Sequence, residues 1–265
     1  MEVQAQSLLF NRIARVEATA APLVALASDY PAATSVAPHS HPRDQLLHAL
    51  SGVVHVRTAQ GSWVVPPDCA LWIPAGCVHA VEMAGPVQMR SAYLRPGAAG
   101  QAADRPRVLA MNDLARALIV ELGRIAEAEA PDPRAEMLAG LLIAEISRLE
   151  EQPLALPLPQ DPRLLRLCRA FLEAPSARLS LKDWAARAAM SRRSLTRRFR
   201  AETGLSPEGW RQQACVLCAL PRLVAGMPVT SIALDLGYDS PAAFATMFRR
   251  HLGQSPRDWR RETRL

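Results

Sequence analysis

The stretch FRAETGLSPEGWR at Phe199–Arg211 is followed by a second version of itself, FRRHLGQSPRDWR at Phe248–Arg260. Both copies fit the pattern F-R-x-x-x-G-x-S-P-x-x-W-R. The glycine of the first copy, Gly204, is a natural stop for the helix that precedes it. The pattern therefore predicts that one helical unit occurs twice near the end of the chain.

Each copy is preceded by the same arrangement of helices. In SLKDWAARAAMS, at 180–191, the apolar side chains recur at the spacing of one buried helix face, and Ser180 can cap the start. SRRSLTRRFRAETG follows after a short turn, with Leu195 and Phe199 on its buried side. PVTSIALDLGYDSPAAFATMFRRHLG repeats the plan, with Phe244 and Phe248 at the matching places. We expect two tandem helix-turn-helix units, each with an exposed second helix.

The charge of the chain is divided between its two halves. Residues 1–161 hold 12 basic and 17 acidic side chains, whereas residues 162–265 hold 19 basic and 8 acidic ones. A basic half joined to an acidic half predicts an anionic partner for the carboxy-terminal half alone. The 265 residues suffice for two modest domains, and no run of about 18 apolar residues predicts a membrane span. The start lacks the order of a signal peptide, and five cysteines fit a reducing cytoplasm.

The tandem repeat, the G-x-S-P-x-x-W-R endings and the turn ALDLGYDSP closely resemble the AraC/XylS family of bacterial transcription regulators, over roughly residues 162–265. The resemblance implies binding to double-stranded promoter DNA, with RNA polymerase as a further partner. It also implies two sets of contact residues on the second helix of each unit. The residues expected at base edges are Arg193, Thr196, Arg197, Ala242, Ala243 and Thr246. Those expected at phosphates are Arg192, Arg200, Arg249 and Arg250.

The two expected recognition helices differ in chemistry. The second presents small and mostly apolar side chains, which can touch a thymine methyl but cannot make bidentate hydrogen bonds. We therefore expect the first unit to supply most of the direct base readout. The second unit would then act mainly through phosphate contacts of Arg249 and Arg250.

The segment between the two units departs from the family at three positions. Cys215 and Cys218 stand where the family usually has arginines, and they spell C-x-x-C. One interpretation is a functional site, either a redox switch or half of a metal site. The other is that two small side chains pack on a buried face of the helix. Pro221 stands where a helix former is usual, so we expect a kink or break in the connecting helix.

The amino-terminal half has a different pattern. Residues 8–100 read as short strands separated by Pro, Gly and Asp, which favours a sandwich or barrel. Within it, PHSHPRDQLLHALSG and WIPAGCVHAVEM resemble the two motifs of the cupin superfamily. This resemblance implies a divalent metal, Zn, Ni, Mn or Fe, held by His39, His41, Gln45 and His79. The alternative is a polar-lined pocket that has lost its metal.

These patterns predict a multidomain α and β protein. A cupin-like sensor barrel would occupy 1–104, a helical dimerisation segment 105–151, a linker 152–162 and the double helix-turn-helix domain 163–265. The second helix of the dimerisation segment is expected to run to about residue 152. We expect a cytoplasmic, homodimeric regulator, and no enzyme, that responds to a small molecule or a metal. The alternatives are a metal-dependent cupin enzyme fused to a DNA-binding domain, and an architectural DNA binder without an effector.

Overall fold

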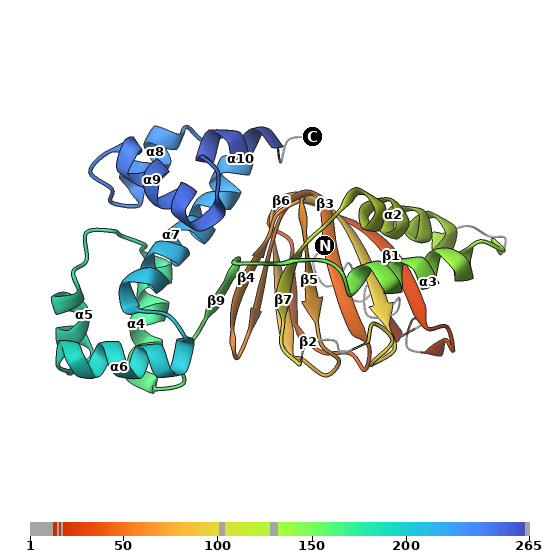
Figure 1. Ribbon diagram of the computed structural model, residues 1–265, viewed down its shortest axis with the longest axis horizontal. Helices are drawn as coiled ribbons and strands as arrows, with labels where there is room; N and C mark the ends of the chain where they lie inside the picture. The colour runs from red at the N-terminus through yellow and green to blue at the C-terminus, as the bar shows by residue number, and fades with distance from the viewer. Residues whose placement is uncertain (1–12, 15, 17, 101–103, 128–131, 263–265) are drawn as a thin grey trace. The chain divides into compact units, whose positions relative to one another are not determined.

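The computed structural model describes residues 13–14, 16, 18–100, 104–127 and 132–262 (Figure 1). They form two compact units, which we call the β unit and the helical unit. The β unit runs to Gln152, and the helical unit begins at Pro153 and also includes the hairpin tip Ala59–Ser62. Most of the amino-terminal segment, in which we expect no signal peptide, lies outside the described residues. Among the residues that are described, no helix is both long enough and apolar enough to cross a membrane.

The β unit is built on an antiparallel sheet in the order β1-β6-β3-β5-β7-β8, with β2 paired to β6 and β4 paired to β3. Two long strands, β3 and β6, form its centre and pair along most of their length. The strands are β1 (Leu23–Tyr30), β2 (Ser35–His39), β3 (Asp44–Thr58), β4 (Gly61–Val65), β5 (Cys69–Ile73), β6 (His79–Leu94), β7 (Arg107–Ala110) and β8 (Glu151–Gln152).

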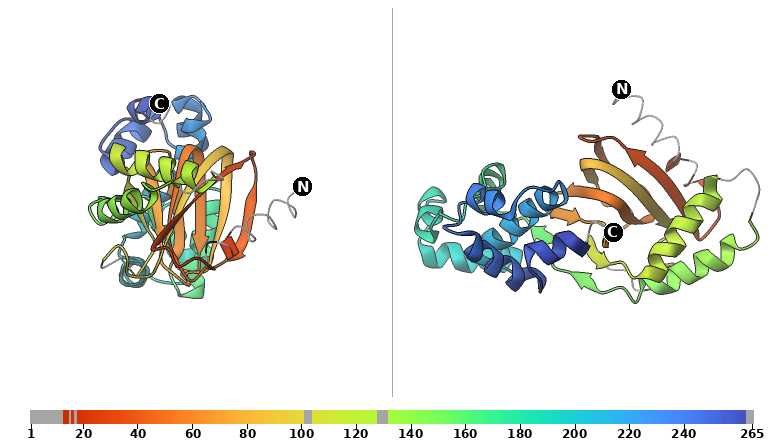
Figure 2. Two further views of the ribbon diagram at one scale, coloured as in Figure 1. Left: turned by 90° about the vertical axis from the view of Figure 1, so that its right-hand side faces the viewer. Right: turned by 90° about the horizontal axis from the view of Figure 1, so that it is seen from above.

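Two helices, α2 (Asp113–Glu127) and α3 (Ala135–Ile146), pack on each other and against β1 (Figures 1 and 2). The strands that they cover contribute Leu46, Trp72 and Leu94, which are fully buried in one apolar core with Leu118 and Leu142 of the two helices. Since neighbouring residues of a strand point to opposite faces, Gln45 and Leu47 belong to the other face of the sheet. The two helices therefore cover one face of the sheet, and the predicted metal ligand Gln45 lies on the opposite face.

The helical hairpin corrects two expectations. Residues 107–110 were included in the predicted helical segment but form β7, which pairs with β5. The second helix was expected to reach residue 152 but ends at Ile146, and Glu151–Gln152 pair with β7 as β8. In both places sheet pairing prevails over helical periodicity, because a short apolar run fits either structure when tertiary contacts decide.

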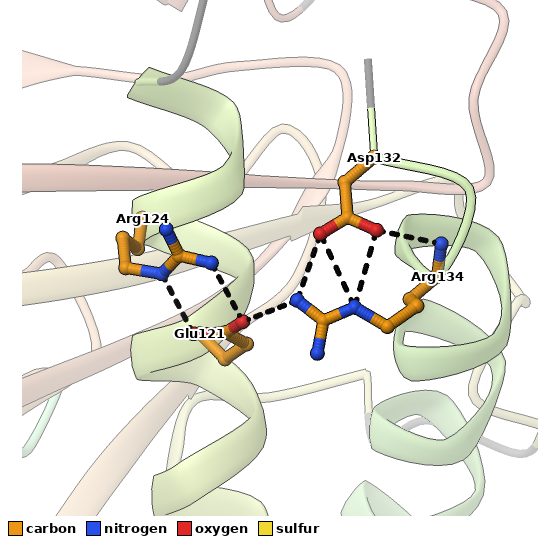
Figure 3. Close-up of polar contacts among 4 residues, drawn as sticks. All are labelled: Glu121, Arg124, Asp132 and Arg134. Carbon is orange, nitrogen blue, oxygen red and sulfur yellow. Dashed lines mark hydrogen bonds and ion pairs between the residues drawn. The ribbon is translucent and has the colours of Figure 1, made fainter. Parts of the chain in front are cut away.

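Ion pairs hold the start of α3 against α2 (Figure 3). Arg134 donates to Glu121 at 2.7 Å and to Asp132 at 2.8 Å, and Arg124 donates to Glu121 at 2.9 Å. The hydrogen bonds from Arg124 and Arg134 lower the pKa of Glu121 to about 2. Two acids and two arginines thus neutralise one another within a single hairpin.

The helical unit contains one short strand and seven helices among the described residues. They are β9 (Ala155–Pro157), α4 (Pro162–Glu173), α5 (Leu181–Arg187), α6 (Arg192–Thr203), α7 (Pro207–Val224), α8 (Val229–Asp235), α9 (Pro241–Leu252) and α10 (Pro256–Glu262). The long helix α7 contacts α6 as well as α8, α9 and α10, so both helix-turn-helix units are built on it (Figure 1). The fold class expected from the sequence, a β-rich amino-terminal part and an all-α tandem helix-turn-helix, is confirmed.

Aromatic side chains fill the cores of the two helical repeats. In the first, the rings of Phe171, Trp184, Phe199 and Trp210 meet with centroids 5.7–6.0 Å apart, mostly at steep interplanar angles. Such edge-to-face pairs add to the stabilisation that burial alone gives. The guanidinium of Arg211 lies 5.3 Å from the centroid of Trp184 and donates to Leu179 O. The second repeat uses Tyr238, Phe244, Phe248 and Trp259 in the same manner.

Residues 152–162, for which the sequence predicts a linker, make ordered contacts within the helical unit. Trp210 Nε1 donates to Pro157 O at 2.7 Å, and Gln213 donates to Ala155 O. Glu202, near the end of α6, accepts from the backbone N–H groups of residues 160 and 161 at 2.8 and 2.9 Å. The segment is therefore bound to α6 and α7.

Helix α7 continues through Pro221 to Val224, so the expected break does not occur. Pro221 has no N–H to donate to the carbonyl of residue 217, and the helix nevertheless continues for three further residues. Cys215 is buried, and burial raises its pKa to about 12. A suppressed thiolate favours the packing interpretation of Cys215 and Cys218 over redox chemistry.

Candidate nucleic-acid interface and histidine cluster

Helix α6 is held by its ends and its inner face so that its arginines point outward. Ser191 Oγ accepts from the N–H of Ser194 at 3.1 Å, and Gly204 ends the helix in the left-handed conformation with φ 75°. Leu195 and Phe199 are fully buried. The opposite side exposes Arg192, Arg193, Arg197, Arg198 and Arg200.

Two open grooves of about 690 and 770 Å³ flank α6. The larger groove is lined by Arg192, Arg193, Thr196, Arg197 and Arg200, all of which the sequence singled out. An exposed helix with several guanidinium groups beside it can make hydrogen bonds to guanine edges and ion pairs to phosphates. The predicted DNA contacts on α6 therefore share one surface of the helical unit.

Helix α9 has the same serine cap and glycine end as α6, but its exposed side chains are different. Ser240 Oγ accepts from the N–H of Ala243 at 3.1 Å, and Gly253 ends the helix with φ 75°. Phe244 and Phe248 are fully buried. The exposed face carries Ala242, Ala243 and Thr246 in its first turns and Arg249 and Arg250 near its end.

The turns that precede these helices contain a backbone feature that the sequence analysis did not identify. Ala189 has a positive φ of 51°, and Gly237, at the matching position of the second repeat, has φ 76°. Glycine adopts this conformation without a penalty, whereas alanine is strained by it. The glycine in ALDLGYDSP indicates this geometry in the second turn, but an alanine gives no such signal in the first.

In the β unit, three predicted metal ligands lie together. The ring centroids of His39 and His79 are 4.3 Å apart, those of His41 and His79 5.3 Å, and those of His39 and His41 6.2 Å. His39 belongs to β2 and pairs with His79, the first residue of β6. We call His39, His41 and His79 the histidine cluster.

In each ring of the histidine cluster, Nδ1 lies within hydrogen-bond distance of a backbone carbonyl oxygen. His39 Nδ1 lies 2.9 Å from Ala37 O, His41 Nδ1 2.6 Å from Arg43 O, and His79 Nδ1 2.9 Å from Cys77 O. A neutral imidazole that donates through Nδ1 carries a lone pair on Nε2. Within the described part of the chain, the buried Nε2 of His79 has no hydrogen-bond partner.

Burial controls the protonation of this cluster. Desolvation lowers the pKa of His79 to about 4, with the neighbouring His39 and His41 contributing in the same direction. Desolvation also lowers the pKa of His39, against the opposing effect of its bond to Ala37 O. His39 and His79 are therefore neutral near pH 7, the form in which imidazole can bind a metal.

The side chain of Gln45, the fourth predicted ligand, is hydrogen-bonded to two residues of β6. Its Nε2 lies 3.1 Å from both Ser91 Oγ and Tyr93 Oη, and its Oε1 lies 3.0 Å from His41 Nε2. Gln45 pairs directly with Tyr93 across the sheet. Ser91 and Tyr93 were missed by the sequence analysis, because they lie outside both motifs and only the strand register brings them to Gln45.

The contact between His41 and Gln45 is consistent with more than one arrangement. With Nδ1 donating to Arg43 O, His41 Nε2 is an acceptor and faces the amide oxygen, another acceptor. Exchanging the amide oxygen and nitrogen gives a donor there, and the hydroxyls of Ser91 and Tyr93 can donate to the oxygen. A His41 that carries protons on both ring nitrogens is a second arrangement, and a cation held by His41 Nε2 and Gln45 Oε1 would be a third.

The side chains of this cluster do not form a closed metal site. Within the described ranges, no three His, Cys, Asp or Glu side chains are positioned to hold a metal ion together. Binding would therefore require the rings to turn from their present positions. His48 and His55, both on β3, lie outside the cluster. His48 is fully buried, and its Nδ1 lies 2.8 Å from Cys69 O.

Comparison with known proteins matches two family models, and the first extends beyond the β unit into the helical unit. Residues 21–181 match the model of the AraC-like ligand binding domain, and residues 184–262 match a model described as a helix-turn-helix domain. The HTH-type transcriptional regulator NimR of Escherichia coli (strain K12) is 34% identical over 218 residues, which are 82% of this chain and 80% of NimR. The chain belongs to the AraC family of transcription regulators.

Two solved structures are also similar to this AraC-family chain. The DNA-binding domain of AdpA in complex with a target DNA is 37% identical, with a TM-score of 0.37, and covers 38% of this chain and 93% of that one. ToxT from Vibrio cholerae with bound unsaturated fatty acid is 9% identical, with a TM-score of 0.38, over 90% of this chain and 94% of that one. The family matches confirm a DNA-binding regulator with a ligand-binding domain, and they support the expectation that the chain is no enzyme.

Proposed function

We propose that this AraC-family chain is a homodimeric regulator whose binding to promoter DNA is set by an effector at the histidine cluster. The cluster and Gln45 would hold a divalent metal, which forms the centre of the effector site. In the helical unit, α6 and α9 would enter the major groove and read the operator. The observation that carries the metal proposal is that three histidine rings lie side by side and each has its Nδ1 beside a backbone carbonyl, although the rings would have to shift to hold a metal together.

Fixing one ring nitrogen on a carbonyl is how proteins orient histidines that bind metals through the other nitrogen. The buried Nε2 of His79, which lacks a partner among the described residues, and the 3.0 Å approach of Gln45 Oε1 to His41 Nε2 support the same donor set. Imidazole nitrogens suit Zn, Ni and Fe, and the neutral amide of Gln45 holds a hard cation such as Mn less well than a carboxylate would. A bound divalent cation supplies the positive charge that attracts an anionic effector.

Metal content provides the direct test. The protein is purified without a His tag, and its metals are measured by elemental mass spectrometry beside a His41→Ala/His79→Ala variant. We expect about one metal per chain, lost in that variant and retained in a His55→Ala control, because His55 lies outside the cluster. No binding after addition of Zn, Ni, Mn and Fe salts would refute the metal and leave the histidines as the lining of a polar pocket.

Effector control is tested through linkage between the two sites. An effector that favours one arrangement of the regulator changes its affinity for the operator, and the operator must change effector affinity by the same factor. We would measure operator Kd with and without the metal, and metal Kd with and without the operator. Equal affinities under all conditions would show that the site does not regulate DNA binding.

The helical hairpin of α2 and α3 is the proposed dimer surface. It exposes four apolar side chains: Leu114 (44% exposed), Val120 (36%), Met137 (69%) and Leu141 (44%). The ion pairs among Glu121, Arg124, Asp132 and Arg134 are satisfied within one chain, so a second copy can pack here without disrupting them (Figure 3). We expect Met137→Lys/Leu141→Lys to sediment as a monomer.

A matched control is available on α8, where Leu234 is 59% exposed. Leu234→Lys also adds a charge at an exposed apolar position but leaves the hairpin intact. It should therefore sediment like the wild-type protein in analytical ultracentrifugation. A wild-type monomer at all concentrations would contradict the proposed dimer, and dissociation by Leu234→Lys alone would place it on another surface.

A further inference from the structure

The two recognition helices share one frame, which allows their surfaces to be compared position by position. Both begin at a serine that caps the third helical N–H, at Ser191 and Ser240, and both end at a glycine with φ 75°. Counted from the capping serine, Arg193 of α6 corresponds to Ala242 of α9. In the same count, Arg197 corresponds to Thr246.

At both positions a long hydrogen-bond donor in α6 is replaced by a methyl group in α9. Ala242 and Ala243 are exposed and offer only their Cβ methyls. Thr246 is also exposed, but its Oγ1 donates to Ala242 O at 2.9 Å. Since the hydroxyl proton is used within the helix, Thr246 cannot donate it to a guanine or thymine acceptor.

The major groove contains one apolar feature that such a surface can recognise. Thymine carries a C5-methyl group there, whereas guanine, adenine and cytosine are distinguished by donors and acceptors. Arg249 and Arg250, exposed near the end of α9, provide charges for phosphates that can hold the helix at the groove.

We infer that α9 selects its half of the operator through the C5-methyl groups of thymine, while α6 selects the other half through hydrogen bonds to base edges. Ala242, Ala243 and Thr246 are the specificity-determining residues of the second repeat. This inference rests on the proposed entry of α6 and α9 into the major groove. It assigns α9 a base preference, beyond the phosphate contacts expected from the sequence.

Deoxyuridine substitution tests the inference, because it removes only the methyl group. An operator is first selected from a random library with the full-length protein. Each thymine is then replaced singly by deoxyuridine, and Kd is measured at constant salt. We expect a loss of about fourfold for each contacted methyl, the factor that corresponds to ~0.8 kcal/mol for a buried carbon group. The sensitive positions should lie within one half-site.

Thr246→Ser assigns the sensitive positions to α9, since it deletes one methyl and retains the hydroxyl that bonds to Ala242. The variant should lose a similar factor on the thymine operator but little on the operator with deoxyuridine at the coupled position. Thr230→Ser, an exposed threonine of α8, is the matched control and should leave Kd and every deoxyuridine effect unchanged.

Three results would overturn the inference. Tight binding with no deoxyuridine effect would show that α9 does not read methyl groups. Coupling of the deoxyuridine effects to Thr196→Ser of α6, with none to Thr246→Ser, would assign methyl readout to the wrong helix. If the protein selects no operator at all, the proposed DNA contacts fail as well, which distinguishes that result from the first two.

Discussion

The burial of His48 predicts a loss of stability in mild acid that can be calculated. This side chain is fully buried in β3, with Cys69 of β5, Arg90 of β6 and Arg116 of α2 around it. Desolvation lowers its pKa from 6.5 to about 4, and the two arginines contribute in the same direction. The unfolded chain therefore binds a proton at a pH where folded His48 remains neutral.

The sign and size follow from proton linkage. Because the folded pKa is lowered, the stabilisation is fully present above pH ~6.5, falls as the pH drops towards 4, and is constant below that. A lowering of the pKa from 6.5 to about 4 corresponds to a total of about 3 kcal/mol, of which about 2 kcal/mol is lost between pH 7 and pH 5. Other buried histidines titrate in the same range, so a variant is needed to isolate this one.

His48→Asn is the appropriate variant, because its amide can still donate to Cys69 O but does not titrate. We would unfold both proteins in urea at pH 7 and pH 5 and follow hydrogen exchange of peptides from β3 and β5, which separates the β unit from the helical unit. The wild-type protein should lose about 2 kcal/mol more than the variant over this interval. Equal losses, or a His48 pKa near 6.5 by NMR titration, would refute the reasoning.

Three further predictions concern the helical unit. Arg193→Ala and Arg197→Ala should each weaken operator binding by about 1–3 kcal/mol and relax specificity at one position, a larger loss than Thr246→Ser causes; a mutated-operator series by fluorescence anisotropy decides this, and the reverse order would contradict it. Ala189→Gly should stabilise the helical unit by about 0.5–1 kcal/mol in thermal unfolding, because glycine adopts a positive φ without strain. Gly237→Ala should destabilise the unit, because the added Cβ would lie 2.7 Å from Ser176 Oγ. Equal effects of the two variants on the unfolding temperature would show that backbone strain does not determine stability at these positions. Trp210→Phe should cost about 1 kcal/mol in urea unfolding through loss of the bond to Pro157 O, and an unchanged midpoint would show that this bond adds nothing.

The sequence carried most of the information about the helical unit. Its helices are local structures whose caps, apolar spacing and stop signals lie within a few residues of one another, and the repeat doubled each signal. Ser180 caps its helix as expected, and Phe199 and Phe248 are buried as expected. Pro221 was expected to kink or break its helix, but α7 continues through it to Val224.

The sequence by itself determined the family, the tandem helix-turn-helix and the identity of the four candidate metal ligands, since each is carried by residues close together in the chain. Only the tertiary structure decided how those ligands meet: sheet register places His39 beside His79 and brings Tyr93 to Gln45. It also decided that residues 107–110 form a strand, and that a segment expected to be a linker bonds to α6 and α7. The physical reason is that strand pairing and side-chain hydrogen bonds join residues far apart in sequence, whereas helix signals are local.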